Sequence, residues 1–348
     1  MDERGVPGPE ALEVPLPGAL TSLEICAGAG GQALGLEQAG FVHEAVVEID
    51  ADACETLRYN REWKVIEGDV ANVDGRAYAR IDLVAGGVPC PPFSIAGKQL
   101  GQDDERDLFP QALRLIDEIR PRAVLLENVR DLGTRRFDAY RTQVLGRLRA
   151  LGHETWWDLV HASDHGVPQL RPRFVLVAIR PPWAAAFRWP EPLPGPPPTV
   201  GETLRDLMGS RGWPGAEAWA RRATGIAPTI VGGSKKHGGP DLGPTRARAA
   251  WSDMGVNGLG IADEVPGPDF PVGQPPKLTI GMVARLQGFP DDWKITGRKT
   301  AAYRQVGNAF PPPVAQALGT AIAAALTGAA AAAPATETGH HASLASGT

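Results

Sequence analysis

The fold is decided by residues 20–35, which spell LTSLEICAGAGGQALG. The largely apolar run from Leu20 to Ile25 predicts a buried strand, and the glycine-rich segment after it predicts a tight turn that opens a helix. Glycine lets a ligand approach the backbone closely, and the N-terminus of the following helix faces that ligand. We therefore expect a strand–turn–helix unit whose turn binds a ligand.

Short apolar runs alternate with helical patterns between Leu20 and Ile179, which predicts βαβ units and a mainly parallel sheet. A helix that ends before Pro121 is predicted by an apolar face that includes Leu115 and Ile119. The predicted strands are Leu20 to Ile25, His43 to Val47, Lys64 to Ile66, Ile81 to Ala85, Ala123 to Leu126, Glu154 to Asp158 and Arg173 to Ile179.

Changes in composition divide the chain into five segments. Proline is dense from Pro181 to Pro198, which marks a linker, and periodicity is poor from there to Pro276. Helical patterns return at Ile280 to Leu286 and at Val314 to Leu326, so we expect the chain to leave the first domain and re-enter it. The predicted segments are a disordered lead-in (1–18), a first domain (19–198), a small second domain (199–276), a return segment that packs on the first domain (277–327) and a disordered Ala-rich tail (328–348).

The composition excludes several classes of protein. The 348 residues are 43% hydrophobic, enough for a sizeable core, and the net charge of -5 gives no overall positive field toward nucleic acid or a membrane. Three widely spaced cysteines argue against a disulfide scaffold or an all-cysteine metal site. The N-terminus lacks the pattern of a signal peptide, and the uncharged stretch from Val314 to Ala333 is Ala-rich and interrupted by polar residues. We expect a cytoplasmic protein with no metal and no membrane contact.

A carboxylate follows the glycine turn at the spacing of a nucleotide-binding site. Glu48 lies twenty residues after Gly28, at the end of the second predicted strand, where it can accept hydrogen bonds from ribose hydroxyls. Asp69, after the third strand, could hold an adenine amino group. The pattern fits NAD as well as an adenosyl sulfonium, and the glycines could instead serve only close packing of strand and helix.

Cys90 is the predicted nucleophile. It follows the fourth strand in GGVPCPPFS, residues 86–94, where prolines on both sides restrict the backbone and present the thiol on a stiff loop. Cysteines that serve only as small hydrophobes usually lie within helices or strands, and that is our interpretation of Cys26 and Cys54. A stiff loop at the carboxyl end of a strand favours a reacting thiol.

A carboxyl group and two guanidinium groups are predicted at the same edge of the sheet. Glu127 ends the fifth strand, where burial can raise its pKa so that the acid donates to a ring nitrogen. Arg171 and Arg173 alternate at the entry to the last strand, and with Gln169 they outline a pocket. A solvated glutamate and a salt-bridged strand edge are the alternatives.

Taken in order, these motifs resemble the DNA cytosine-5 methyltransferase family, the C5-methyltransferases, from about Leu23 to Leu318. Eight ordered motifs do not match by chance, and an NAD enzyme would explain the glycines but none of the later motifs. The motifs are AGAGG (27–31), EID (48–50), GDV (68–70), PC with FS (89–90 and 93–94), ENV (127–129), GVPQ with Arg171 and Arg173 (166–173), RLQGFP (285–290) and QVGNA (305–309).

The resemblance implies the α/β fold of class I S-adenosylmethionine-dependent methyltransferases. This is a Rossmann-like, mainly parallel sheet with a terminal antiparallel hairpin, joined to a small irregular target-recognition domain at 199–276. The implied cofactor is S-adenosylmethionine, released as S-adenosylhomocysteine, with its ribose on Glu48 and its adenine near Ile49 and Asp69. The implied cofactor-binding residues are Ala27, Gly28, Gly30, Gly31, Glu48, Ile49, Asp69, Val70, Leu108, Asn308 and Ala309.

The resemblance also implies the reaction. Cys90 would attack C6 of a cytosine flipped out of double-stranded DNA, while Glu127 stabilises N3 and contacts the exocyclic amino group. Arg173 would hold the carbonyl oxygen of the base, and Arg171 is implied as a further catalytic residue. C5 would then take the methyl group, and loss of the C5 proton with expulsion of Cys90 would yield 5-methylcytosine.

Three places depart from the family pattern. Cys26 stands where the family usually has a phenylalanine that packs on the adenine, which puts that contact in doubt. Val88 and Pro91 replace the commoner proline and glutamine of the nucleophile loop, and Pro172 replaces a glutamate between the two arginines. None of these changes removes a reacting group, so we expect an active enzyme.

The second domain carries a local excess of basic residues. Six basic residues and one acid, Asp241, fall between Arg221 and Ala250, which is an electrostatic footprint for DNA. Arg246 or Arg248 could pair with guanine, and the alternative is a solvated basic loop that touches only phosphates. The expected DNA-binding residues are Ser94, Gln169, Arg221, Lys235, Lys236, Arg246 and Arg248.

Two other functions are the alternatives to a DNA methyltransferase. A tRNA cytosine-5 methyltransferase would keep the chemistry, but the second domain lacks the Cys-Phe-Thr element of that branch. A catalytically silent DNA-binding relative is disfavoured because Cys90, Glu127 and Arg173 are all present. We expect a monomer, since base flipping by this architecture needs one active site and one recognition domain. A separately acting restriction endonuclease is a possible partner.

Overall fold

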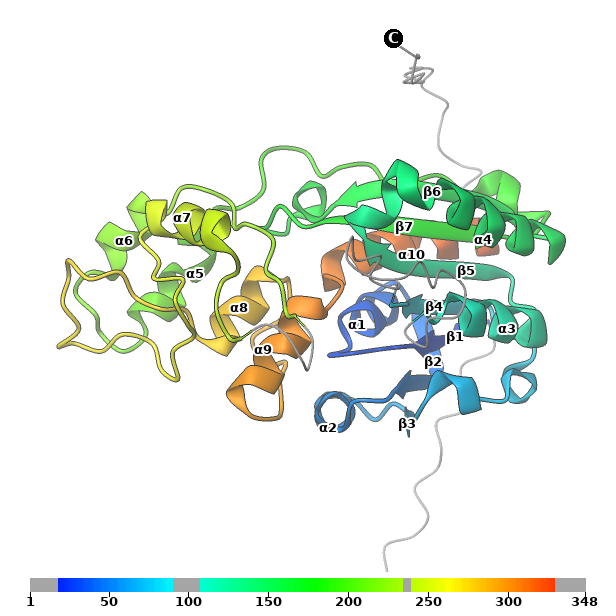
Figure 1. The fold of residues 1–348 in the computed structure, drawn as a ribbon, viewed down its shortest axis with the longest axis horizontal. Coiled ribbons are helices and arrows are strands. Elements are labelled where there is room, and N and C mark those ends of the chain that lie inside the picture. Colours follow the sequence, from blue (N-terminus) through cyan, green and yellow to red (C-terminus); the bar gives the residue numbers. More distant parts are fainter. Residues whose placement is uncertain (1–17, 90–106, 234–238, 329–348) are drawn as a thin grey trace, which may run out of the picture.

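The computed structural model describes residues 18–89, 107–233 and 239–328, and a seven-stranded sheet forms its centre (Figure 1). The strand order is β3-β2-β1-β4-β5-β7-β6, in which β1 to β5 are parallel and β7 is antiparallel to both of its neighbours. The predicted sheet with a terminal antiparallel hairpin is therefore confirmed. The strands are β1 (Leu20–Ile25), β2 (Phe41–Glu48), β3 (Val65–Glu67), β4 (Leu83–Gly87), β5 (Ala123–Val129), β6 (Glu154–His161) and β7 (Pro172–Ile179).

Helices cover both faces of the sheet, which explains why its strands are almost continuously apolar. Side chains alternate between the faces along each strand, so Val84 packs in the cluster beneath α3 while Leu83 packs in the cluster beneath α10. One face carries α1 (Gly31–Gln38), α2 (Ala51–Asn60) and α10 (Pro312–Thr327), and the other carries α3 (Phe109–Ile119) and α4 (Asp138–Ala150).

Helices α1 and α10 pack closely at Gly35. A Cβ on Gly35 would lie 2.3 Å from the carbonyl oxygen of Pro312 and 2.5 Å from the Cβ of Ala315. Gly146, inside α4, has no atom within 4 Å of the same position. We predict that Gly35→Ala lowers the free energy of unfolding by about 1–3 kcal/mol through overpacking, whereas Gly146→Ala raises it by up to about 1 kcal/mol. Urea unfolding of the two variants checks this, and equal effects would contradict the close helix contact.

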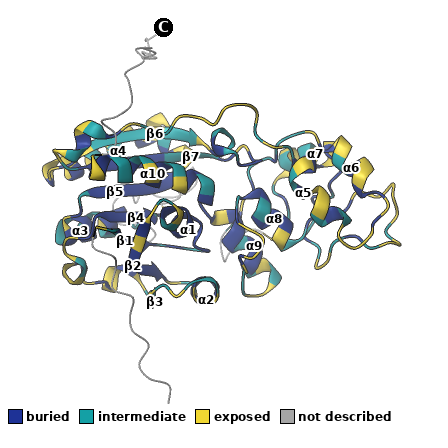
Figure 2. Cartoon of the chain, turned by 180° about the vertical axis from the view of Figure 1, so that it is seen from behind, coloured by how far each residue is buried: buried dark blue, intermediate teal, exposed yellow. Residues whose placement is uncertain are grey.

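A second lobe lies beyond one edge of the sheet (Figure 1). The helices α5 to α9 share one hydrophobic cluster that includes Leu204, Trp251 and Met282, and exposed residues gather on α6 and α7 (Figure 2). The helices between 199 and 276 are short and separated by glycine and proline, so the periodic spacing of their apolar residues is too brief to predict them from the sequence. The helices of this lobe are α5 (Val200–Gly209), α6 (Ala216–Arg222), α7 (Thr245–Asp253), α8 (Ile280–Leu286) and α9 (Lys299–Asn308).

The return segment divides between the two lobes. Helices α8 and α9 belong to the cluster of the second lobe, while α10 packs on α1 and on the sheet. Residues 299–327 are long and apolar enough to cross a membrane by length and composition, but Leu318 and Ile322 of α10 are fully buried in the core. The helix predicted from Val314 to Leu326 is confirmed, and the five segment boundaries stay a prediction.

Candidate functional site

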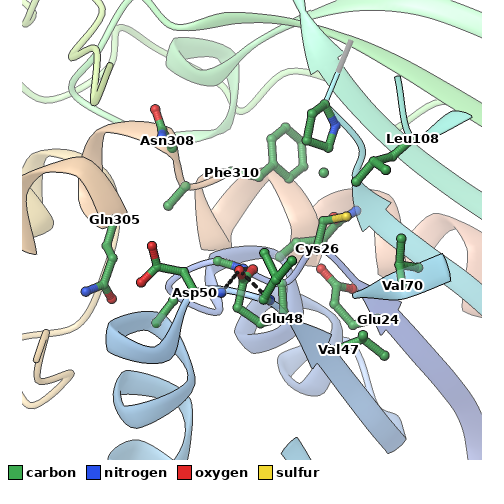
Figure 3. Close-up of a pocket in the computed structure, with 18 of the residues that line it drawn as sticks. Glu24, Cys26, Val47, Glu48, Asp50, Val70, Leu108, Gln305, Asn308 and Phe310 are labelled. Atoms are coloured by element: carbon green, nitrogen blue, oxygen red, sulfur yellow. Dashed lines mark hydrogen bonds between the residues drawn. The ribbon is translucent and has the colours of Figure 1, made fainter. Parts of the chain in front are cut away.

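A cavity of about 560 Å³ opens at the carboxyl ends of β1, β2, β4 and β5. In an open parallel sheet this edge is where ligands bind, because the strand ends and the turns after them leave a crevice. Side chains from these strands, together with Asn308 and Phe310 from the end of α9 and the turn after it, surround the cavity (Figure 3). The cavity therefore lies between the sheet and the return segment.

Glu48 is held rigidly in the wall of this cavity. Its carboxylate accepts hydrogen bonds from the backbone N–H of Gly28 at 2.7 Å, and from those of Ile49 and Asp50 at 2.8 Å each (Figure 3). Gly28 has φ +55°, a conformation that favours glycine, and no atom lies within 4 Å of where its Cβ would be. The glycine turn and the carboxylate thus form one preorganised wall.

Most of the predicted cofactor-binding residues come together here. Gly30 and Gly31 do not line the cavity, and a Cβ on Gly31 would lie 2.2 Å from the carbonyl oxygen of Phe310. A Cβ on Gly30 would lie 2.7 Å from the Cδ2 of Leu57. These two glycines therefore permit close packing around the turn. The predicted residues that do line the cavity are Ala27, Gly28, Glu48, Ile49, Asp69, Val70, Leu108, Asn308 and Ala309.

Several lining residues were missed by the sequence reasoning. Arg304 of α9 pairs with Asp50 of the turn after β2, with Nη2 and Oδ2 3.2 Å apart, so an ion pair joins two walls of the cavity. Asp50 belongs to the EID motif and Arg304 directly precedes the QVGNA motif, and a charged residue inside a largely apolar strand was the available signal for Glu24. The missed polar residues of the lining are Glu24, Gln32, Asp50, Arg304 and Gln305.

Cys26 lines the cavity between Glu24 and the glycine turn. Its φ of +54° is in the left-handed region, which is unusual for a residue with a side chain. Burial, and secondarily the nearby carboxylates Glu48, Glu24 and Asp69, raise the pKa of the Cys26 thiol. The group is therefore a neutral thiol and not a nucleophile, in agreement with its interpretation as a small hydrophobe.

Glu127 and Arg173 form a buried ion pair beside the cavity. The Arg173 Nε lies 2.8 Å from Glu127 Oε1, although its N–H is not aligned as a hydrogen bond. Burial raises the pKa of the Glu127 carboxyl group, which Arg173 and Arg171 only partly oppose. Glu127 of β5 lies opposite Gly87 of β4, and Cys90 follows Gly87 by three residues in the chain. A carboxyl group that can be protonated thus lies beside the end of the strand that precedes the predicted nucleophile in the sequence.

Arg171 and Gln169 join the two lobes. Arg171 is fully buried and donates hydrogen bonds to the carbonyl oxygens of Ile230, at 2.7 Å, and Gly307, at 2.9 Å. Gln169 is also fully buried, accepts from the Ile230 N–H and donates to the Gln287 side chain. The structure places neither side chain in the lining of the cavity, and both hold segment 227–230 against the hairpin and the return segment.

The family model of C-5 cytosine-specific DNA methylases matches residues 20–324. The chain belongs to the C-5 cytosine-specific DNA methylase family. The activity is methylation of cytosine in DNA at C5, and the family uses S-adenosylmethionine. The type II methyltransferase M.NaeI of Lentzea aerocolonigenes is 60% identical over 315 residues, which cover 88% of this chain and 76% of that protein. M.NgoMIV of Neisseria gonorrhoeae is 53% identical over 310 residues, covering 88% and 98%.

Solved structures share the fold of this methylase at low sequence identity. A DNA modification methyltransferase from an Escherichia coli prophage has a TM-score of 0.62 and 21% identity, and the match covers 89% of this chain and all of that one. The DNMT2 structure from Spodoptera frugiperda has a TM-score of 0.61 and 17% identity, covering 87% and 99%. These likenesses support the confirmed class I methyltransferase fold.

The three arginines predicted to bind DNA lie on two helices of the second lobe, whereas Gln169 is fully buried before β7. Arg221 and Arg246 are exposed on α6 and α7, and Arg248 is half-buried. Asn308 of the cavity wall donates a hydrogen bond to the Gly233 carbonyl oxygen at 3.1 Å, so the chain leading to residues 234–238 starts beside the cofactor cavity. The predicted residues outside the described part of the chain are Cys90, Ser94, Lys235 and Lys236.

Proposed function

We propose that this methylase transfers a methyl group to C5 of a flipped cytosine, within one short DNA sequence, through a covalent bond between Cys90 and C6. The observation that carries the proposal is the buried Glu127–Arg173 pair beside the cavity, in which Glu127 lies opposite Gly87, three residues before Cys90 in the chain. A surface glutamate paired to arginine would be solvated and ionised, whereas burial favours the acid form of Glu127.

The cavity fits S-adenosylmethionine, which supplies the transferred methyl group when bound. Three backbone N–H groups donate hydrogen bonds to the Glu48 carboxylate and fix its position. Its remaining lone pairs can still accept hydrogen bonds from ribose hydroxyls. Ile49 is 68% exposed and offers an apolar surface for the adenine at the cavity mouth. Acidic residues outnumber basic ones in the lining, which suits a ligand that carries a sulfonium charge.

The chain's own residues would carry the chemistry on the base. The Cys90 thiolate bonds to C6, Glu127 donates its proton to N3, and Arg173 holds the carbonyl oxygen of the cytosine. These contacts place negative charge on C5, which then accepts the methyl group. A base removes the C5 proton, the C6–sulfur bond breaks, the Cys90 thiolate is restored, and the N3 proton returns to Glu127. The two reacting atoms of the base are buried in stacked DNA, so the reaction requires base flipping.

The second lobe would read the DNA. Arg246 is exposed on α7, and Arg248 lies two residues further along the same helix, about half a helical turn away. We predict that replacing both with alanine lowers affinity for target DNA by about 1–3 kcal/mol if either contacts a base. Binding to target and scrambled duplexes at one salt concentration separates the two roles, because a phosphate contact lowers both affinities equally. Unchanged affinity for both duplexes would leave these arginines as solvated charges.

The names of the relatives support a proposal about a partner enzyme. M.NaeI and M.NgoMIV are type II methyltransferases, so a separately acting restriction endonuclease is the proposed partner. One cofactor cavity beside one recognition lobe suits a protein that works as a monomer, and we propose that it needs no metal ion. We expect the protein to work in the cytoplasm, where the DNA and the cofactor are available.

Bisulfite sequencing tests the proposed function. A plasmid is grown in a host that lacks cytosine methylation and expresses this chain, beside the same host expressing the Cys90→Ser variant. Protected cytosines within one short recurring sequence, found only with the wild-type chain, are the expected result. Their absence, with a folded protein that binds S-adenosylmethionine, would contradict the proposal.

A further inference from the structure

The chain that follows β5 runs from Glu127 to the surface of the catalytic lobe, the lobe that contains the sheet. Val129 lies opposite Arg173 in the register of β5 and β7, two residues beyond Glu127, and it is 52% exposed. Arg130 comes next and is also exposed. Because each residue of a chain spans at most about 3.6 Å, the Cα atoms of Arg130 and Glu127 lie within about 11 Å of each other. The surface at Arg130 therefore borders the pocket proposed for the flipped cytosine.

Two short turns after β5 are fixed on the sheet. They are the 3-10 helices η3 (Arg130–Gly133) and η4 (Arg135–Phe137). Gly133 packs so closely on Phe174 of β7 that a Cβ on Gly133 would lie 2.2 Å from the phenylalanine ring. Arg141 of α4 donates hydrogen bonds to the carbonyl oxygens of Leu132, at 2.6 Å, and Thr134, at 3.0 Å. These contacts hold the backbone of both turns in place before any ligand binds.

This segment carries more positive than negative charge, because residues 130–141 contain four arginines and two aspartates. Arg136 and Arg141 each form an ion pair with one of these aspartates, and so they serve the fold of the segment. Arg130 and Arg135 are exposed, and neither has an ion-pair or hydrogen-bond partner in the described part of the chain. The local excess of positive charge therefore belongs to Arg130 and Arg135, in a chain whose net charge is -5.

The pocket needs positive charge that its own lining does not supply. Flipping turns a nucleotide about its backbone, so the phosphates on both sides of the base must lie near the pocket while the base is inside it. Arg304 is the one basic residue among the described lining residues of the cavity, and it is engaged in an ion pair. Arg173 is buried against Glu127. Guanidinium groups bind phosphate oxygens through charge-assisted hydrogen bonds, so Arg130 and Arg135 fit the phosphates beside the pocket.

We propose that Arg130 and Arg135 form a phosphate clamp on the catalytic lobe, in which their guanidinium groups bind the backbone of the DNA strand that carries the flipped cytosine. This inference rests on the proposed flipping of a base beside Glu127, and it adds the part of the catalytic lobe that holds the strand. The clamp contacts phosphates and not base edges, so it acts on every DNA sequence alike. Recognition of the target sequence stays with the second lobe, and both lobes hold the duplex.

The salt dependence of DNA binding measures the clamp. The Kd of the full chain for a target duplex and for a scrambled duplex is measured between about 50 and about 200 mM salt, for the wild type and for the double variant Arg130→Gln/Arg135→Gln. Each lost phosphate contact reduces the slope of log affinity against log salt by about 0.9. The double variant is therefore expected to bind both duplexes more weakly by the same factor. This deficit should shrink by about tenfold over that range of salt.

Two further variants separate a local clamp from a general effect of charge. Arg80→Gln/Arg149→Gln removes two charges from exposed positions before β4 and at the end of α4, at the opposite edge of the sheet, and is expected to keep the wild-type slope. Arg130→Lys/Arg135→Lys keeps the charges of the clamp and is expected to keep most of the slope. Because all four side chains are exposed, every variant should keep the Tm of the wild type and its Kd for S-adenosylmethionine.

Uncharged phosphates locate the clamp on the DNA. Once bisulfite sequencing has given the target sequence, a single methylphosphonate linkage is placed on one side or the other of the target cytosine. At least one of these linkages is expected to weaken binding by the wild type and to add little to the loss in Arg130→Gln/Arg135→Gln, because both changes remove the same contact. Losses that add in full at both positions would place the clamp elsewhere and overturn the inference.

The salt titration can also overturn the clamp. A wild-type slope in Arg130→Gln/Arg135→Gln would show that these arginines are solvated charges. An equal change of slope in Arg80→Gln/Arg149→Gln would assign the effect to net charge, and a loss confined to the target duplex would assign it to a base contact. Each of these results leaves the proposed function standing, provided that the wild type methylates DNA. Absence of methyl transfer by the wild type would overturn the proposed function itself.

Discussion

The Cys90→Ser variant is expected to lose methyl transfer by about 10³-fold or more, while its Kd for S-adenosylmethionine stays within a few-fold of the wild-type value. The thiolate bonds to the base and not to the cofactor, so the substitution removes the nucleophile and keeps every described residue of the cavity lining. Serine has nearly the same size, but its hydroxyl is far less acidic and is not a thiolate equivalent at neutral pH. Transfer of labelled methyl groups to target DNA measures the loss, and calorimetry measures cofactor binding.

A matched control exists in Cys54→Ser. Cys54 is buried in α2, outside the cavity lining, and its thiol donates to the Glu48 carbonyl oxygen at 3.3 Å, a contact that serine can keep. Transfer by this variant should stay within a few-fold of wild type.

A second experiment detects the covalent bond between Cys90 and the base. A 5-fluorocytosine at the target has no C5 proton to lose, so the bond to the wild-type chain should survive in a denaturing gel, whereas Cys90→Ser should form no such bond. Substantial methyl transfer by the Cys90→Ser variant would contradict the assignment of Cys90 as the nucleophile.

The strands of the fold could be predicted because their signal is local. Apolar runs separated by glycine and proline place β1 to β7 within three residues of their observed bounds, since a buried parallel strand must be apolar on both faces. The short helices α5 to α7 could not be predicted in this way. Each contributes only a few residues, such as Trp219 and Trp251, to a cluster assembled from segments far apart in the chain.

Part of the site could not be predicted from the sequence, because it too depends on contacts between segments far apart in the chain. Glu48 on β2 and Glu127 on β5 both lie at the carboxyl ends of parallel strands, which meet at one edge of the sheet, so their convergence follows from the predicted sheet. The partners of Arg171 do not, because Ile230 and Gly307 lie 59 and 136 residues away along the chain. An arginine beside a motif looks catalytic by position, and only the tertiary contacts show that this one donates to the backbone of the other lobe. Glu24 is the one charged residue of β1, and a charged residue in a strand by itself suggests a solvent-facing position.

Glu127→Gln is expected to lower kcat by about 10²–10⁴-fold, the usual contribution of a positioned acid. The amide is isosteric and can still fill the space beside Arg173, but it has no proton to transfer to N3. Burial raises the pKa of Glu127, so the reactive acid form is present below that pKa and is lost as pH rises through it. The wild-type kcat should therefore fall on the alkaline side, and this limb should disappear in the glutamine variant.

The Glu118→Gln variant separates the acid from its ion pair. Glu118 of α3 also pairs with an arginine, Arg114 at 2.9 Å, but lies outside the cavity lining. Its glutamine variant should keep the wild-type kcat and the alkaline limb, because breaking a half-buried pair changes only stability, by about 0–1 kcal/mol. Single-turnover methyl transfer across pH, with DNA and cofactor saturating, compares the three proteins. An alkaline limb that survives in Glu127→Gln would assign the titration to another group, with Cys90 and the base itself as the remaining participants. An unchanged kcat would remove Glu127 from the chemistry.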